Sequence, residues 1–573
     1  MDEQSSPRTI LTADIGTAWT NLALIERVGG VYRLAARVDT PTQSTDRIDL
    51  RASLVRALLR MQDIAQRPLL DPEEAPIQPR QGDRGSDLLV VTTSAGGALR
   101  CALIGLTDDL SLEPGRMACA LTGTEITDEI GLTLDRPVRH RALAGLRTSP
   151  PDVIVILGGV DAGPTRPFTS AAAVLSTLYA GTPETERPVI VFAGNLEARR
   201  PVADALGASF DYRVVDNIHP RLGESSPQEL QRELARVHAE RRLPQLGGFE
   251  AVSGWACVPI MSSGTGIGVV LQFLSRQGRY GQRVLGLDVG GAGTHLALTG
   301  DYPATVQASG PGTAQGLDRL LDGDGMKHIA RWLSTPALEA AAPAMLRNRA
   351  LRPQTLPDGP AEGAVLLAAT REALRVPLEA LDSLTDGATA SIDLIVARGG
   401  VINHAETDGL TLLALLDAVQ PRGFTRVVMD WASVCPGLGA LAQHAPLAAL
   451  QVLEHDALRE LGTVLSLGGR GIAGQPALRF RLEQGTDTAE AEVPWGSLAR
   501  IALAPGGAVC KVWPLQGAEL GDGLPVGPDQ FHEYVLPEAT LNLIIDARGR
   551  PLTLPADDTA RYQELQTWQS TLS

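Results

Sequence analysis

The stretch LGLDVGGAGTHLAL, residues 285–298, has a near copy at the start of the chain, LTADIGTAWTNLALI, residues 11–25. Each reads as an apolar strand, an Asp-x-Gly turn with small polar residues, and a second apolar strand. Glycine permits a tight turn that brings backbone N–H groups against an anion, and threonine adds a hydroxyl donor. A single hairpin of this kind would indicate only an ordinary turn, because Asp and Gly are common turn residues. Two copies in matching context predict a pair of hairpins that hold phosphates from opposite sides.

The carboxylates of the two hairpins, Asp14 and Asp288, are the candidate ligands of a hydrated metal ion bound with those phosphates. A later pair of glycines, Gly399 and Gly400, follows an apolar strand in the segment SIDLIVARGGVINH, residues 391–404. Two glycines there let the chain pass close to a flat ring or a sugar, which a side chain would block. We therefore predict a nucleotide site built from the two hairpins and this turn.

The composition is that of an ordinary globular protein, with 573 residues, 44% of them apolar and 20% charged. This length predicts roughly two to four domains. The net charge of -16 and the lack of a basic run argue against a nucleic-acid partner. The polar N-terminus does not resemble a signal peptide, and no window reaches the roughly 18 apolar residues of a membrane span, so we expect a cytoplasmic protein. The five cysteines are widely spaced, as buried thiols in a reducing compartment are.

Two regions are predicted before the second hairpin. Residues 8–98 and 220–283 form a first lobe that opens with three strands and a helix, the β-β-β-α order of a ribonuclease-H-like fold. A connecting helix over residues 259–276 leads from it to the second hairpin. Residues 99–219 form an inserted subdomain, because continuous apolar strands such as DVIVILGG alternate with helices, as in a doubly wound parallel sheet. We expect a helix that starts near Ala98.

Two more regions are predicted after it. Residues 284–450 form the second lobe, which begins with the second hairpin and is mainly helical in its middle. Residues 451–573 differ, because short alternating segments such as ALRFRLEQG lie between Gly and Pro turns. This pattern predicts a small all-β module that ends in a helix over residues 557–570. The predicted fold class is therefore α/β, with two lobes, an insert and a C-terminal all-β module.

The order of hairpin, connecting helix, hairpin and Gly-Gly turn resembles that of the actin, sugar kinase and DnaK-chaperone ATPase superfamily. Within it the chain is most similar to the MutL-type accessory proteins of adenosylcobalamin-dependent glutamate mutase. The similarity lies in TTSAGGALRCALIGLT, DVIVILGGVDAG, VIVFAGN and ARGGVIN, and it covers most of the chain up to about residue 450. It implies two actin-like lobes that hold ATP or ADP with Mg²⁺.

The resemblance also implies roles for particular residues. Asp14 and Asp288 would hold the magnesium shell or orient the attacking water, and would thus be catalytic. The residues that would contact the nucleotide are Gly16, Thr17, Asn21, Gly290, Gly291, Thr294, Gly399 and Gly400.

For function, the resemblance implies a chaperone-like, ATP-driven reactivating factor, with the subunits of a cobalamin-dependent mutase as partners. Two departures leave hydrolysis open: DnaK-like second hairpins usually carry another Asp where this chain has His295, and many relatives carry Lys where it has Asn21. A missing carboxylate weakens the ion shell, and a missing lysine removes a charge from the phosphates. The alternative is a non-hydrolysing actin-like scaffold or assembly protein with a degenerate nucleotide site. A small-molecule kinase is a third possibility, but no catalytic base stands out. Whether the protein forms a homo-oligomer is left open.

Overall fold

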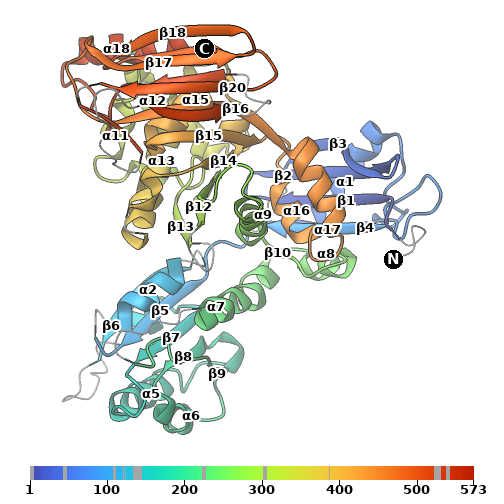
Figure 1. Cartoon of the computed structure of the whole chain (residues 1–573). Coiled ribbons are helices and arrows are strands. Elements are labelled where there is room, and N and C mark those ends of the chain that lie inside the picture. Colours follow the sequence, from blue (N-terminus) through green and yellow to red (C-terminus); the bar gives the residue numbers. More distant parts are fainter. Residues whose placement is uncertain are drawn as a thin grey trace. The chain divides into compact units, whose positions relative to one another are not determined.

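The computed structural model describes residues 6–42, 48–107, 111–120, 122, 124–132, 143, 145–221, 228–300, 306–385, 387–515, 517–521, 531–536 and 542–573. The chain forms two compact units (Figure 1). One unit comprises Met1–Ala95 and Ala251–Ser573, and the other is Gly96–Glu250. The larger unit contains both hairpins, and the smaller one contains the predicted insert together with residues 220–250, which the sequence analysis placed in the first lobe.

The first-lobe sheet confirms the predicted β-β-β-α opening. Its strand order is β10-β4-β1-β2-β3, where β1, β2 and β3 are antiparallel neighbours and β4 runs parallel to β1. Helix α1 (Leu50–Ala65) packs on this sheet and begins where the Asp49 side chain accepts a hydrogen bond from the N–H of Ala52. The strands are β1 (Thr9–Ile15), β2 (Trp19–Val28), β3 (Val31–Pro41), β4 (Leu88–Thr93) and β10 (Met261–Ser262).

The second-lobe sheet repeats this topology. Its first five strands follow the order β13-β12-β11-β14-β15, with β11, β12 and β13 antiparallel and β14 parallel to β11. The two predicted hairpins, β1–β2 and β11–β12, therefore occupy equivalent places in two equivalent sheets. The strands are β11 (Val284–Val289), β12 (Gly293–Thr299), β13 (Val306–Pro311), β14 (Leu394–Arg398) and β15 (Gly423–Asp430). This repeat is the two-lobed actin-like fold that the sequence predicts.

The C-terminal region is rich in strands, and part of it extends the second-lobe sheet. Beyond β15 that sheet continues through β16, β23 and β19. A separate four-stranded sheet has the order β18-β17-β20-β22. The bounds are β16 (Leu458–Gly469), β17 (Pro476–Gln484), β18 (Asp487–Pro494), β19 (Leu498–Ala502), β20 (Ala508–Pro514), β22 (His532–Leu536) and β23 (Asn542–Asp546).

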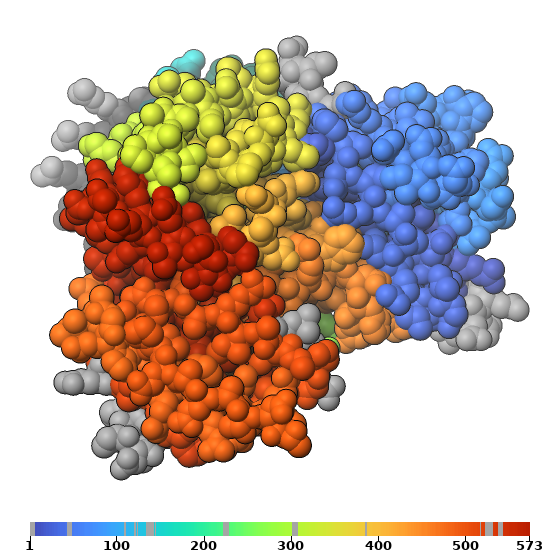
Figure 2. All heavy atoms as spheres, turned by 90° about the horizontal axis from the view of Figure 1, so that it is seen from above, coloured from blue at the N-terminus to red at the C-terminus, as the bar shows by residue number. Residues whose placement is uncertain are grey.

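The terminal helix α18 (Asp558–Leu572) is present as predicted and returns to the second lobe. It starts where the Asp557 side chain accepts from the N–H of Ala560. Figure 2 shows it, in red, beside residues of the second lobe in yellow-green, where Arg561 forms a 2.6 Å ion pair with Glu339 of α12 (Pro336–Leu351). The C-terminal region is thus joined to the second lobe by both sheet and helix.

The unit Gly96–Glu250 has the doubly wound sheet that its apolar strands predict. Its five parallel strands follow the order β6-β5-β7-β8-β9, with buried apolar side chains on both faces. The prediction of a helix that starts near Ala98 is wrong, because Arg100–Gly105 forms strand β5. A short apolar run fits a buried strand as well as a buried helix. The other strands are β6 (Glu125–Gly131), β7 (Val153–Gly158), β8 (Val189–Gly194) and β9 (Tyr212–Val214).

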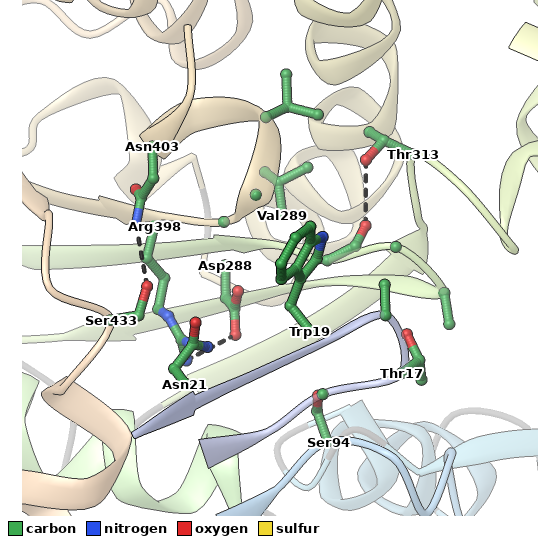
Figure 3. Close-up of a pocket in the computed structure, with 18 of the residues that line it drawn as sticks. Thr17, Trp19, Asn21, Ser94, Asp288, Val289, Thr313, Arg398, Asn403 and Ser433 are labelled. Atoms are coloured by element: carbon green, nitrogen blue, oxygen red, sulfur yellow. Dashed lines mark hydrogen bonds and ion pairs between the residues drawn. The ribbon is translucent and has the colours of Figure 1, made fainter. Parts of the chain in front are cut away.

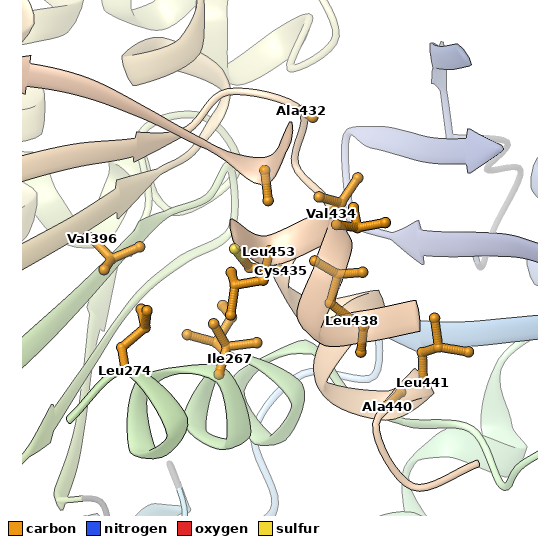
Figure 4. Packing of buried hydrophobic residues seen from close by; sticks show 14 of the residues in the cluster. Ile267, Leu274, Val396, Ala432, Val434, Cys435, Leu438, Ala440, Leu441 and Leu453 are labelled. Atoms are coloured by element: carbon orange, nitrogen blue, oxygen red, sulfur yellow. The ribbon is translucent and has the colours of Figure 1, made fainter. Parts of the chain in front are cut away.

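Two helices join the lobes of the larger unit. The predicted connecting helix is α9 (Ser263–Gln277), and it packs against α16 (Cys435–Leu441) in a shared apolar core (Figure 4). The helices approach closely because glycines face each other: a Cβ on Gly439 would lie 1.9 Å from the carbonyl oxygen of Gly266. No described helix combines the length and apolar character that crossing a bilayer requires.

The contact between α9 and α16 yields a stability prediction. Gly439→Val should lower the free energy of unfolding by roughly 1–3 kcal/mol, because overpacking forces the backbones apart. Thermal or denaturant unfolding measures this. The matched control is Gly254→Val in helix α8 (Phe249–Trp255), where an added Cβ meets no atom within 4 Å. Equal stability of the two variants would contradict the proposed close packing.

Candidate functional site

The two hairpins have the same turn geometry. In the first, the Gly16 N–H donates to the carbonyl of Trp19 at 2.9 Å, and in the second, the Gly290 N–H donates to the carbonyl of Gly293 at 3.0 Å. The strand registers also correspond. Asp14 lies opposite Asn21 across β1–β2, and Asp288 lies opposite His295 across β11–β12. Asn21 and His295, the two departures noted in the sequence, are therefore the cross-strand partners of the two predicted carboxylates.

Both turns line one open pocket, and the Gly-Gly turn after β14 lines it too (Figure 3). Its volume is about 950 Å³ when the open solvent at its mouth is included. The predicted residues that line it are Asp14, Gly16, Thr17, Asn21, Asp288, Gly290, Gly291, Gly399 and Gly400. Thr294 is the exception: its side chain is buried, and its hydroxyl donates to the Pro311 carbonyl at 2.7 Å.

The glycines of the third turn serve two different needs. Gly399 has a φ of +134°, and a Cβ there would lie 2.2 Å from the Val289 carbonyl oxygen, so the turn can form only with glycine. At Gly400 an added Cβ would meet no atom within 4 Å. Gly400 therefore keeps open space in the pocket, whereas Gly399 lets the second hairpin and the third turn approach each other.

An arginine that the sequence analysis overlooked lies at the centre of the site. Arg398, the last residue of β14, donates from Nη2 to Asp14 at 2.7 Å and from Nη1 to Asp288 at 3.3 Å. Its Nε lies 3.7 Å from Asp430 at the end of β15. The Arg398 side chain is only 8% exposed. One buried guanidinium thus faces three carboxylates and links the first lobe to the second.

The other bonds of these carboxylates differ. Asp14 also accepts hydrogen bonds from the hydroxyls of Thr92 at 2.8 Å and Ser263 at 2.6 Å, so both of its oxygens are in use. Asp430 accepts from the backbone N–H groups of Val434 and Cys435 and thereby caps the start of α16. Asp288 has no further hydrogen-bond partner within the described ranges, and it is the carboxylate most available to a ligand.

Burial and charge set the protonation of the site. Burial raises the pKa of Asp288 and of Asp430, and the charge of Arg398 opposes that rise. Burial lowers the pKa of Arg398, but the three carboxylates outweigh it, and the pKa of this arginine lies above its ordinary value. Arg398 is therefore a permanent cation.

His295 is held beside the same cluster. Burial lowers its pKa, which favours the neutral imidazole, and the charge of Asp288 opposes this shift. Its Nδ1 lies 2.9 Å from the hydroxyl of Ser309 on β13. The histidine thus has a local partner and presents a neutral polar group beside Asp288.

The pocket fits a polar ligand. Five buried polar atoms on residues that line it have no hydrogen-bond partner among the described residues: Trp19 Nε1, Asp39 Oδ1, Arg349 Nε, Arg398 Nε and Asn403 Oδ1. Buried polar groups in folded proteins are nearly always hydrogen-bonded, so a cluster of unpartnered ones indicates that a ligand or water completes them. With the two glycine turns and the open space at Gly400, the residues fit a nucleotide.

Magnesium fits less well. No group of three or more Asp, Glu, His or Cys residues suited to a metal ion occurs in the described part of the chain. Asp14, one of the two predicted ligands, already uses both oxygens, and Arg398 lies between it and Asp288. Asp288 alone has an oxygen available. The assignment of Asp14 and Asp288 to a metal stays a prediction.

Solved structures with similar chains were also found. A nucleotide-free structure of acetone carboxylase, which carries out ATP-dependent acetone carboxylation, is 14% identical with a TM-score of 0.36, and the match covers 90% of this chain and 82% of that one. An ATP-dependent caprolactamase from Pseudomonas jessenii is 12% identical with a TM-score of 0.33, covering 84% and 81%. Plasmodium falciparum glycerol kinase with ADP is 9% identical with a TM-score of 0.31, covering 79% and 94%.

Sequence comparison is more decisive. No curated protein matches the chain. A family model described as MutL protein matches residues 10–457, which include both hairpins, the smaller unit and the Gly-Gly turn. The match spans most of the chain and confirms the resemblance seen in the sequence. The protein belongs to the MutL family.

Proposed function

We propose that the protein binds ATP and ADP in the pocket between the two hairpins. The observation that carries this proposal is the symmetry of the site: two hairpins with the same turn, register and Asp-x-Gly sequence line one pocket from two lobes. Gly16, Thr17, Gly290 and Gly291 would hold the phosphates, because turns of this kind direct backbone and hydroxyl donors at anions. Gly399 and Gly400 would contact the adenosine, with Asn21 as a further predicted contact, whereas the buried Thr294 would support the second turn from behind through its hydrogen bond to Pro311.

The predicted carboxylates would act on the phosphates. Asp14 and Asp288 would orient water or metal-bound water near the γ-phosphate, and Asp288 has the freer oxygens for this role. Magnesium bound with the nucleotide would neutralise phosphate charge.

The biological role that we propose is that of a reactivating factor for a cobalamin-dependent mutase such as glutamate mutase. Membership of the MutL family supports this role. So does the two-lobed fold, because a ligand that favours one arrangement of two lobes can change the affinity for a protein partner. The mutase subunits would be the partners, and the protein would act as a chaperone that releases damaged cofactor. The test is recovery of activity by an inactivated mutase when this protein, ATP and fresh adenosylcobalamin are added.

Calorimetric titration tests the nucleotide site. The wild type should bind ATP and ADP with a Kd in the micromolar range or below, and Asp288→Ala should weaken binding of the magnesium complex by at least roughly tenfold, since it removes a carboxylate of the site. Asp14→Ala should also weaken binding, although it breaks hydrogen bonds to Thr92 and Ser263 as well. The control is Asp324→Ala, which alters an exposed residue outside the pocket. Wild-type protein that binds neither nucleotide would contradict the proposal.

The second candidate function is a non-hydrolysing scaffold or assembly protein with the same fold. The ion pairs of Arg398 favour it, because they occupy carboxylates that a hydrolytic site would need free. Release of phosphate from magnesium ATP separates the two candidates. A reactivating ATPase should release phosphate faster than its Asp288→Ala variant does, whereas a scaffold should show no difference.

A further inference from the structure

The guanidinium of Arg398 lies where the two hairpins come together. It contacts Asp14 on β1 of the first lobe and Asp288 on β11 of the second, at 2.7 Å and 3.3 Å. Figure 3 shows Arg398 pointing from the end of β14 toward Asp288. In the proposed nucleotide site, the position between the two phosphate hairpins is the one that a metal ion would take. Here the chain itself supplies that cation.

The arginine cannot move away at low cost. Its side chain is 8% exposed, and Asp14 and Asp430 are 6% and 0% exposed. If it left, Asp14 and Asp430 would remain buried beside the 14% exposed Asp288, with no positive charge among the described residues that contact them. Removing one member of a buried charge cluster is strongly destabilising for this reason. Conversely, a divalent ion that joined Asp14 and Asp288 while Arg398 stayed would lie next to a like charge.

We propose that Arg398 is the resident cation of this site and latches the two lobes together through Asp14 and Asp288. While it does so, the nucleotide-free protein binds no divalent metal at these carboxylates. Arg398 is thus a positioning residue. A metal ion can enter with its nucleotide only if the ion pair between Arg398 and Asp14 is loosened. This inference rests on the proposed nucleotide site, but its test needs no nucleotide.

The first test replaces the arginine with an apolar residue of similar length. Arg398→Met should have a lower Tm than the wild type in EDTA, and millimolar Mg²⁺ or Mn²⁺ should raise that Tm by roughly 3 °C or more, because a ligand of the native state stabilises it. The wild-type Tm should not respond to either ion. Titration with Mn²⁺, followed by the electron paramagnetic resonance signal of the free ion, should show about one site per chain in the variant and none in the wild type.

Two further variants make the result specific. Arg398→Met combined with Asp288→Asn should lose both the Mn²⁺ site and the rescue of the Tm. Arg548→Met is the matched control, because Arg548 is also buried against two aspartates, Asp417 and Asp546, but outside the pocket. The Arg548→Met variant should have a lower Tm than the wild type, and neither Mg²⁺ nor Mn²⁺ should raise that Tm. If Arg398→Met does not fold, the Arg398→Lys variant is used in its place. Lysine keeps the positive charge on a shorter side chain, so this variant should still exclude Mn²⁺.

The outcomes divide clearly. Stoichiometric Mn²⁺ binding by the nucleotide-free wild type would overturn the proposal, as would an Arg398→Met variant that folds and gains no ion site, or Mn²⁺ binding by Arg398→Lys. A failure of the wild type to bind ATP, with the ion results as expected, would overturn the proposed function and leave the latch intact. The two failures are therefore distinguishable.

Discussion

Gly400→Leu should abolish nucleotide binding without destabilising the protein. Gly400 lines the pocket, and an added Cβ there meets no atom within 4 Å, so the fold tolerates a side chain that takes up space needed by the ligand. We expect the affinity for ATP and for ADP to fall on the order of 100-fold or more, which corresponds to about 2.7 kcal/mol. Calorimetric titration measures the affinity, and thermal unfolding should give the wild-type Tm.

The control is the same substitution at Gly254, an equally open position on helix α8 away from the pocket. Gly254→Leu should bind nucleotide like the wild type. If Gly400→Leu bound ATP with unchanged affinity, the adenosine could not lie at the Gly-Gly turn. If it bound ATP less well but ADP normally, the turn would be near the γ-phosphate instead.

Asp546→Ala should destabilise the larger unit by about 3–5 kcal/mol. Asp546 ends strand β23 and is fully buried, and it forms ion pairs with Arg548 at 2.8 Å and Arg550 at 2.5 Å. Arg548 in turn pairs with Asp417 of helix α15 (Asp408–Val419). Removing Asp546 leaves Arg550 as a buried charge with no carboxylate partner among the described residues, so the loss should far exceed that of a surface pair. Denaturant unfolding measures it.

The matched control is Asp324→Ala, which breaks an exposed pair with Lys327 and should leave the stability unchanged. The effect should also depend on pH. Burial raises the pKa of Asp546, but Arg548 and Arg550 outweigh burial and hold that pKa well below its ordinary value. Its contribution is therefore complete above the unfolded-state pKa of about 3.9 and is lost as pH falls toward the folded-state pKa. A difference between variant and wild type that grew on acidification would contradict this account.

Much of the site was predictable because its signals are local. The Asp-x-Gly turns and their flanking apolar strands specify two hairpins within about 15 residues each, and strand and turn preferences act at that range. The repeat of the motif then placed two equivalent turns on two lobes. All predicted residues except Thr294 line the pocket, and Thr294 faces inward because its position in β12 puts its hydroxyl on the Pro311 carbonyl.

Arg398 was missed because the role of this residue depends on partners that are far away in the sequence. In the sequence it is one arginine before a glycine pair, and Asp14, its shortest ion-pair partner, lies 384 residues away. Asp430 is likewise the last residue of a strand, and only the fold brings its carboxylate to the start of α16 and to Arg398. A charged residue at the end of a continuous apolar strand was the available signal, since such a residue is rarely buried without a partner.

The sequence by itself determined the two-lobed α/β architecture, the doubly wound insert and the positions of the three glycine turns. It could do so because apolar periodicity and turn preferences depend on residues that are close together in the sequence. Tertiary structure alone decided which partners those segments take. It places β16, β23 and β19 in the second-lobe sheet rather than in a sheet of their own, since pairing of strand edges depends on which edge is open nearby. It also brings one guanidinium between three carboxylates from two lobes, because a buried charge must find its counter-charge wherever the fold places it.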